Sequence, residues 1–231
     1  MKTALVTGSN RGIGKALADY YVAQGFTVYA GARNISNMPG SNPNLRPIVL
    51  DVEDDNSIRA AIATIKAESS NLDLVINNAG VSKGSATGGH SELVSELRLL
   101  DREKLLGMMD VNTISPLMVA KYAVPIMARP GSFIINISSL RATYANSADG
   151  NGNYGYSSSK LALNMMTLCL AHDLPGNIST FAVHPGSVQT GMNPAGQMTP
   201  AESAEYIGSI IQNWNPNLNG KFLNYDGAVL H

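Results

Sequence analysis

Two side chains spaced four residues apart, Tyr156 and Lys160, form the clearest acid–base pair in this chain of 231 residues. Residues four apart on an α-helix share a face, so the phenol and the ammonium group can converge on one site. A phenol has an unperturbed pKa of about 10, and a neighbouring positive charge favours the phenolate. The spacing therefore predicts that Lys160 lowers the pKa of Tyr156 and makes the phenol a usable general acid and base.

A nearby tyrosine competes for this role. Tyr154 lies six residues from Lys160, and on an ideal helix it points roughly 240° away from that lysine. The spacing therefore favours Tyr156 over Tyr154. Taken alone, the pair of Tyr156 and Lys160 is also compatible with a half-buried tyrosine beside a solvated lysine.

Three further polar residues are placed where they could assist the same reaction. Ser138 and Ser139 end a predicted strand, where a hydroxyl group can donate a hydrogen bond to the oxygen of a reacting carbonyl. Asn112 lies in a long helical segment, although asparagine is a poor helix former. A structural cap would explain Asn112, and a buried amide that holds a water molecule in a proton path is the sharper hypothesis.

A glycine-rich turn has the features of a phosphate-binding site. The segment from Thr7 to Gly14 reads TGSNRGIG and directly follows an apolar run. Gly8 permits a tight turn, Gly12 lets the backbone approach a pyrophosphate, and Gly14 lets the next helix pack close to the sheet. The spacing G-x-x-x-G-x-G departs from the G-x-G-x-x-G dinucleotide fingerprint, so an ordinary glycine-rich connection stays open as the alternative.

The charges beside this turn favour NADP(H) over NAD(H). An acid at the end of the second strand would bind the ribose 2′-hydroxyl group of NAD, whereas an arginine accommodates the 2′-phosphate of NADP. The sequence has Arg33 at this place, and Arg11 adds a second cation within the glycine turn. Guanidinium groups suit phosphate, so the sequence predicts NADP(H), although both arginines could simply be surface residues.

Short apolar segments alternate with segments of helical spacing. The predicted strands are 3–7, 26–30, 47–51, 72–77, 132–138, 178–184 and 221–225, and the predicted helices are 12–24, 56–69, 102–127, 156–173 and 200–213. Strands that are apolar along most of their length are buried on both faces. The alternation predicts an α/β fold with a doubly wound parallel sheet of about seven strands, flanked by helices on both faces, in a single domain over residues 1–231.

Two other motif matches are chance matches in our interpretation. Gly80 to Gly84 reads G-x-S-x-G, but the hydrolase motif needs a following helix, and the glycines that come next disfavour one. Ser157 to Lys160 matches the S-x-x-K of penicillin-binding enzymes, whose S-D-N and K-T-G partner motifs the sequence lacks.

The composition excludes several classes of protein. The 16 basic and 17 acidic side chains give a net charge of −1, which supplies no basic stripe, so we expect no nucleic-acid partner. No apolar run approaches the roughly 20 residues that span a bilayer, and the first residues lack the features of a signal peptide. The single cysteine, Cys169, fits a reducing compartment and excludes thiolate metal clusters. We therefore expect a cytoplasmic protein with no membrane partner and no metal.

Taken together, the motifs resemble those of the short-chain dehydrogenase/reductase family. The resemblance runs from residue 7 to residue 190 in the family's order, and segments 154–165 and 220–227 further resemble the C-factor and Sniffer-like carbonyl reductases. It implies a Rossmann-type fold and reversible hydride transfer between NADP(H) and a small-molecule carbonyl substrate, namely an aldehyde, ketone or quinone. An NADP(H)-binding sensor or signalling protein of the C-factor type is the alternative.

The resemblance also implies a catalytic tetrad. Tyr156 would donate a proton to the developing alkoxide, and Ser139 would hydrogen-bond the same oxygen. Lys160 would lower the pKa of Tyr156 and bind the nicotinamide ribose, and Asn112 would hold the water in the proton path. The second serine of the family's pair is usually the catalytic one, which selects Ser139 over Ser138. The 17 residues from Ser139 to Tyr156 exceed the family's usual spacing, which we interpret as an enlarged rim of the substrate pocket.

The implied cofactor contacts are spread over several motifs. They are Gly8, Ser9, Asn10, Arg11, Gly12, Ile13, Gly14, Arg33, Asp51, Val52, Asn78, Ala79, Gly80, Tyr156, Lys160, Pro185, Gly186, Val188 and Thr190. Members of the family often pair through the helices that bear the asparagine and the tyrosine of the tetrad, so a homodimer or homotetramer is an expectation. Apolar residues of the second helix could form that face or belong to the core: Leu161, Leu163, Met165, Met166 and Leu168.

Overall fold

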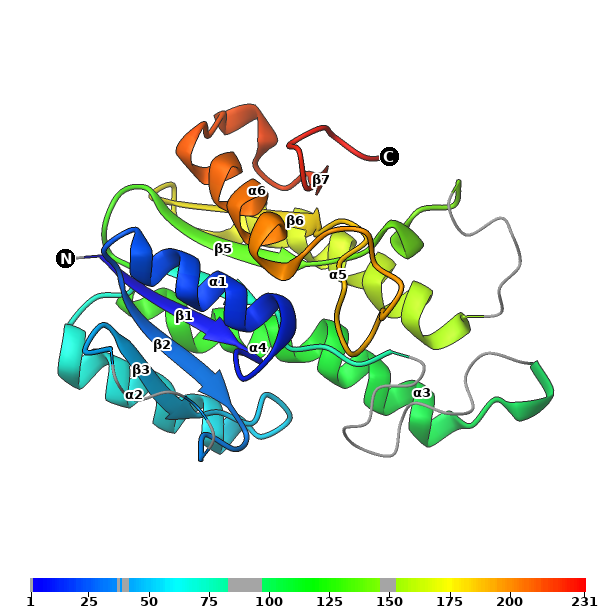
Figure 1. Cartoon of the computed structure of the whole chain (residues 1–231), viewed down its shortest axis with the longest axis horizontal. Helices are drawn as coiled ribbons and strands as arrows, with labels where there is room; N and C mark the ends of the chain where they lie inside the picture. The colour runs from blue at the N-terminus through cyan, green and yellow to red at the C-terminus, as the bar shows by residue number, and fades with distance from the viewer. Residues whose placement is uncertain (1, 37, 39–41, 83–96, 146–152) are drawn as a thin grey trace.

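Seven parallel strands form one sheet in the computed structural model, which describes residues 2–36, 38, 42–82, 97–145 and 153–231 (Figure 1). The strand order is β3-β2-β1-β4-β5-β6-β7, so the direction of winding reverses between β1 and β4. The strands are β1 (Thr3–Thr7), β2 (Thr27–Ala32), β3 (Leu45–Val49), β4 (Leu74–Asn77), β5 (Ser132–Ile137), β6 (Ile178–His184) and β7 (Phe222–Asn224).

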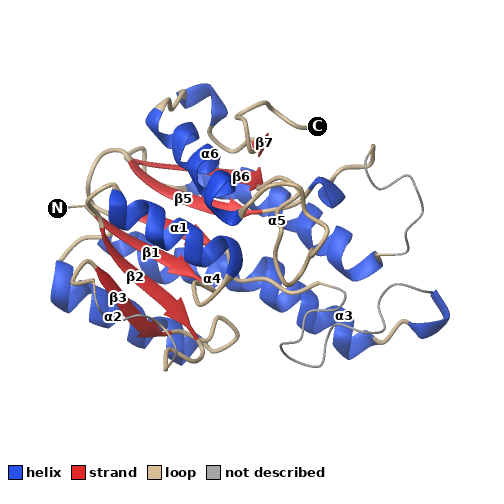
Figure 2. Ribbon diagram, viewed as in Figure 1, coloured by secondary structure: helices blue, strands red, loops and turns tan. Residues whose placement is uncertain are grey.

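Helices cover both faces of the sheet (Figure 2). On one face lie α1 (Gly12–Ala23) and α6 (Pro200–Gln212), and on the other lie α2 (Asp55–Ser69), α4 (Ser115–Ala123) and α5 (Tyr154–Asp173). Alternate residues of β1 enter the two cores: Val6 packs on the side of α1, and Leu5 packs on the side of α2. The predicted doubly wound α/β fold is confirmed, and the carboxyl ends of β1 and β4 flank the crevice where such folds bind ligands.

The long helix predicted over 102–127 is wrong, because the structure divides it. α3 (Arg102–Met109) is followed by a π-helical turn, η2 (Asp110–Ile114), then by α4 and a 3-10 turn over Val124–Ile126. Pro116 has no N–H group to donate to the carbonyl of Asn112, and Ser115 N instead donates to Asp110 O. The helical hydrogen bond here therefore spans five residues in place of four, and the widened turn contains Asn112, one of the candidate site residues.

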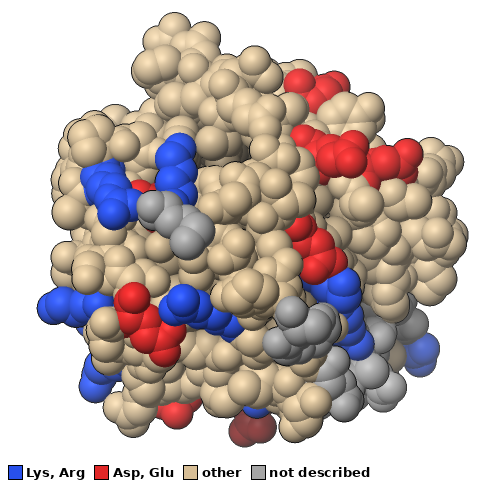
Figure 3. All heavy atoms as spheres, turned by 60° about the vertical axis from the view of Figure 1, so that its left-hand side comes forward, with Lys and Arg blue, Asp and Glu red and all other residues tan. Residues whose placement is uncertain are grey.

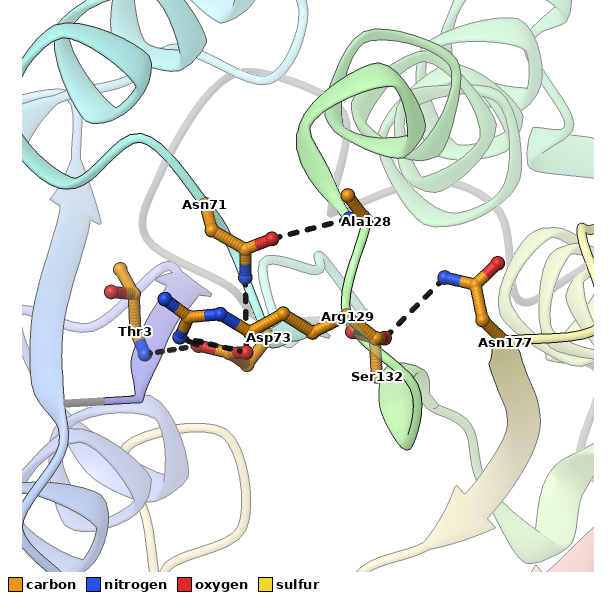
Figure 4. A network of polar contacts seen from close by, with 7 residues as sticks. All are labelled: Thr3, Asn71, Asp73, Ala128, Arg129, Ser132 and Asn177. Carbon is orange, nitrogen blue, oxygen red and sulfur yellow. Dashed lines mark hydrogen bonds and ion pairs between the residues drawn. The ribbon is translucent and has the colours of Figure 1, made fainter.

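A polar network joins the amino ends of three strands, at the edge opposite the crevice (Figure 4). The buried Asp73 carboxylate accepts hydrogen bonds from Thr3 N at 2.7 Å and Asn71 Nδ2 at 3.0 Å, and it pairs with Arg129 at 3.3 Å. Asn71 Oδ1 in turn accepts from Ala128 N at 3.2 Å. The network fixes the start of β1 and β4 against the segment that leads into β5.

Charged side chains lie singly or in small groups on the face drawn in Figure 3, and most of that face is uncharged. Two of the exposed ion pairs are Lys15 with Asp19 at 2.6 Å and Arg46 with Glu68 at 2.8 Å. In the part of the chain that the structure describes, no helix is long and apolar enough to cross a membrane.

The apolar residues of α5 divide between the core and the surface. Leu163 is buried, whereas Leu161, Met165 and Leu168 are exposed. These exposed side chains are available to a partner, and the association of two or more copies stays a prediction.

Candidate functional site

Ser139 and Tyr156 meet at the carboxyl end of β5. The Ser139 side chain lies near enough to the Tyr156 phenol to oppose the rise in its pKa, and Ser139 Oγ accepts from Arg141 N at 3.2 Å at the start of the turn Leu140–Ala142. Ser138 is buried, and its Oγ has no hydrogen-bond partner within the described part of the chain. This arrangement favours Ser139 over Ser138 as the partner of the phenol.

The phenol lies beside an apolar cluster. Tyr156 packs against a cluster formed by Val81, Met108 and Val111. Burial raises the pKa of Tyr156, and the Ser139 side chain opposes this rise in part. A raised pKa keeps the phenol protonated at neutral pH.

Lys160 is buried and uses its ammonium group to bind the backbone of β5. Its Nζ donates to Ile137 O at 2.8 Å, and burial lowers the pKa of Lys160 to about 8. The shift in the pKa of Tyr156 is upward because of its burial, and the lowering of this pKa by Lys160 stays a prediction. Helical spacing placed both residues on one face correctly, but it could not give the desolvation of either.

Asn112 acts as a clamp between two elements. Its Nδ2 donates to Val81 O at 2.9 Å and to Ser159 Oγ at 3.0 Å, and its Oδ1 accepts from Val81 N at 2.9 Å. Thr113 Oγ1 donates to Ser159 O at 2.8 Å. Both amide N–H groups of Asn112 are thus bonded to protein, and the role of Asn112 toward a water in a proton path stays a prediction. The sequence analysis missed Thr113 and Ser159, although each adjoins a predicted site residue.

Glycine is required at three positions of the turn after β1. Gly8 and Gly12 have φ angles of +65° and +57°, in the left-handed region that side chains disfavour. A Cβ at Gly14 would collide with Gly8 O and with Asn78 Nδ2. That same Nδ2 group donates to Thr7 O at 2.9 Å and to Gly8 O at 3.1 Å, which joins the ends of β1 and β4.

The amino terminus of α1 faces this turn without a side-chain cap. Asp54, Asp101 and Thr199 cap α2, α3 and α6 through their side-chain oxygens. Arg11, at the corresponding position of α1, makes no such bond within the described residues, and the first turn of α1 has no acidic residue. Free N–H groups at the positive end of a helix dipole fit a bound phosphate group.

The two predicted phosphate-binding arginines are both exposed beside the glycine turn. Arg33 follows β2, and its guanidinium lies 3.8 Å from the carboxylate of Glu53. Ser9, also predicted to contact the cofactor, uses its hydroxyl group to bind Val6 O at 2.9 Å and Gly31 O at 3.1 Å. The Ser9 side chain therefore stabilises the turn itself.

The loop after β6 reaches back over the glycine turn. A Cβ at Gly12 would lie 3.5 Å from Thr190 Cγ2, so residues far apart in the sequence meet at the predicted cofactor site. Gly186 has a φ angle of +91° and lies against Met198 and Tyr225. Asp51, at the end of β3, accepts from Glu53 N at 3.1 Å. The other predicted contacts follow the carboxyl ends of the same strands: Asn10, Ile13, Val52, Ala79, Gly80, Pro185 and Val188.

Some predictions fall on parts of the chain that the structure does not describe. The predicted rim of the substrate pocket, between Ser139 and Tyr156, includes residues 146–152, which lie outside the described residues, as does the end of the G-x-S-x-G match. α5 begins at Tyr154, two residues earlier than predicted, and the Tyr154 side chain is 47% exposed. Its exposure agrees with the preference for Tyr156.

The burial of His184 predicts that the free energy of unfolding depends on pH. Burial lowers the pKa of His184 to about 4, so in the folded protein it stays neutral where an unfolded histidine, with a pKa near 6.5, already binds a proton. We expect the free energy of unfolding to be undiminished above pH 6.5 and to fall as the pH drops from 6.5 to 4, by about 1.4 kcal/mol per unit of pKa difference. Urea unfolding of wild type and of a His184→Gln variant over this range tests it. A variant with the same slope as wild type would contradict the assignment.

Comparisons with known proteins agree with the fold. A family model described as short chain dehydrogenase matches residues 2–200. The chain is 31% identical over 202 residues to a 3-oxoacyl-acyl-carrier-protein reductase from Salmonella typhimurium, covering 84% of this chain and 76% of that protein. Among solved structures, the NADPH-bound carbonyl reductase from chicken fatty liver has a TM-score of 0.89 and 28% identity, covering 100% of this chain and 98% of that one. The carbonyl reductase Sniffer of D. melanogaster has a TM-score of 0.88 and 28% identity, covering 100% and 99%.

Proposed function

The chain belongs to the short-chain dehydrogenase family, and on this premise we propose that it is an NADPH-dependent oxidoreductase that reduces an aldehyde, ketone or quinone to an alcohol. The observation that carries the proposal is the position of Ser139 beside the Tyr156 phenol, at the carboxyl end of β5 and near the glycine turn. The solved carbonyl reductase from chicken liver, similar over the whole chain, is NADPH-bound. This supports the choice of cofactor.

The residues around the crevice fit the dinucleotide. The N–H groups of the uncapped α1 terminus would hold the pyrophosphate, and Arg11 and Arg33 would hold the 2′-phosphate. Asp51 and Val52 would lie at the adenine, and Lys160 would bind the nicotinamide ribose. When bound, NADPH supplies a hydride to the carbonyl carbon of the substrate.

The tyrosine and the serine act on the carbonyl oxygen. Tyr156 donates its phenolic proton to that oxygen as negative charge develops on it, and Ser139 donates a second hydrogen bond that stabilises the same charge. The raised pKa of Tyr156 suits this direction, because the phenol must be protonated before it can act as an acid. The clamp formed by Asn112, Thr113 and Ser159 holds the first turns of α5 in place, so the phenol keeps its orientation.

The surroundings of the phenol favour an apolar substrate. Val81, Met108 and Val111 place buried hydrocarbon against Tyr156. A charged group placed there would lose its hydration without a partner, whereas an alkyl or aryl substituent would not. We therefore place uncharged aldehydes, ketones and quinones first among the substrates.

The alternative, a sensor that binds NADP(H) without turnover, predicts a different result in one assay. Purified protein is mixed with NADPH and a panel of uncharged aldehydes, ketones and quinones, and oxidation of NADPH is followed by its absorbance. Turnover of at least one compound supports the reductase. Tight binding of NADPH with no turnover of any compound, and with a Tyr156→Phe variant indistinguishable from wild type, would favour the sensor.

Replacing Arg33 with aspartate should change the choice of cofactor. The variant loses a charged hydrogen bond to the 2′-phosphate, worth about 1.5–3 kcal/mol, so the ratio of kcat/KM for NADPH over NADH should fall roughly 10- to 100-fold. The matched control is Arg46→Asp, which makes the same change of charge in a different exposed ion pair, near the amino end of β3. An unchanged ratio in the Arg33 variant would remove Arg33 from the cofactor site.

A further inference from the structure

Three buried polar atoms behind the candidate site have no hydrogen-bond partner within the described residues: Ser138 Oγ, Asn164 Oδ1 and His184 Nδ1. A buried polar group without a partner destabilises a fold, and an ordered internal water commonly satisfies such groups where several converge. Ser138 ends β5, His184 ends β6, and Asn164 lies on α5. Whether these atoms converge depends on which face of the sheet each one occupies.

The strand register puts Ser138 and His184 on the same face. Ile137 is paired with Val183, and Ser138 N donates to Val183 O at 2.7 Å, so the ladder continues to the next pair of residues. Ile137 and Val183 belong to the core on the side of α1 and α6. Because side chains alternate along a strand, Ser138 and His184 point to the opposite face, which α5 covers.

Two contacts show which strand residues Asn164 lies opposite. Lys160, one helical turn before Asn164, donates to Ile137 O at 2.8 Å. Thr167, almost one turn after it, accepts from Asn136 Nδ2 at 2.8 Å. Asn164 therefore lies opposite the last residues of β5.

The next residues of α5 show toward which strand Asn164 is turned. Leu168 lies one turn after Asn164 on the same side of α5. A Cβ added at Gly220 would lie 3.2 Å from Leu168 Cδ1, so this side of the helix is close to Gly220. Gly220 N donates to Thr180 O of β6 at 2.8 Å. This side of α5 consequently faces β6, where His184 lies.

We propose that Ser138, Asn164 and His184 bind one internal water molecule. The water donates its two protons to Asn164 Oδ1 and His184 Nδ1 and accepts the hydroxyl proton of Ser138, so each of the three atoms gains a partner. The neutral state of His184, which follows from its burial, leaves a ring nitrogen able to accept.

This water would join the three segments that carry the candidate site. Ser138 directly precedes Ser139, His184 directly precedes Pro185 of the loop over the glycine turn, and Asn164 follows Lys160 by one turn. The site does not depend on the proposed reaction, because it is built only from the chain's own buried groups.

A crystal structure of the wild-type protein, at a resolution that shows ordered waters, tests the site directly. We expect one water within about 2.6–3.2 Å of all three atoms. Direct bonding between Ser138 Oγ and His184 Nδ1, or the three atoms without a shared water, would overturn the proposal.

A thermodynamic cycle gives a second, independent test. Ser138→Ala and His184→Phe each remove one partner of the water. The shift in the midpoint of urea unfolding should therefore be smaller for the double variant than the sum of the shifts for the two single variants. The control cycle pairs His184→Phe with Ser209→Ala, whose hydroxyl group bonds to Tyr206 O in the exposed part of α6, and its shifts should add. Additive shifts for Ser138 with His184 would argue against a shared water.

Discussion

Replacing Tyr156 with phenylalanine is expected to lower kcat for NADPH-dependent carbonyl reduction by about 10²- to 10⁴-fold, the range that a positioned general acid contributes. The substitution removes the hydroxyl group that would protonate the carbonyl oxygen. It keeps the aromatic ring, so the apolar cluster with Val81 and Met108 retains its packing. Steady-state rates with the best substrate from the panel, measured together with the dissociation constant for NADPH, check the prediction.

The same helix supplies the matched control. Tyr154 begins α5 and is 47% exposed, and Tyr154→Phe removes an identical hydroxyl group two residues away. We expect this control to stay within a few-fold of wild type, since exposed substitutions usually perturb the fold little. Equal losses in the two variants would mean that the phenol of Tyr156 is not the proton donor.

The architecture of this chain was predictable because its cause is local in the sequence. Apolar runs that do not alternate indicate strands buried on both faces, and β1 and β6 were predicted to the residue. The break in the predicted helix over 102–127 has a local cause as well. Pro116 has no N–H group to donate to the carbonyl of Asn112, so the residue type itself indicates an irregular turn at this place.

The state of the candidate site was less predictable, because it depends on groups brought together only by the fold. The spacing of Tyr156 and Lys160 gave their common face but not their desolvation, and burial moves their pKa values in opposite directions. The partners of Asn112 lie 31 and 47 residues away along the chain. No spacing rule within a single helix reaches such contacts.

The buried Asp73 carboxylate belongs to no sequence motif, but its hydrogen bonds should contribute strongly to the stability of the fold. Asp73→Ala should lower the free energy of unfolding by about 2–6 kcal/mol, because the two buried donors Thr3 N and Asn71 Nδ2 lose their acceptor and each such loss costs about 1–3 kcal/mol. The midpoint and slope of urea unfolding, followed by circular dichroism, give this quantity.

Two further variants separate the buried carboxylate from its ion pair with Arg129. The Arg129 side chain is half exposed, so Arg129→Met should cost less than Asp73→Ala, because the carboxylate keeps its bonds to Thr3 and Asn71. Asp19→Ala, in the ion pair with Lys15 whose partners are both exposed, should cost about 1 kcal/mol or less. Equal destabilisation by Arg129→Met and Asp73→Ala would contradict this prediction. It would mean that the ion pair between Arg129 and Asp73, and not the hydrogen bond from Thr3 N to Asp73, holds the start of β1 in place.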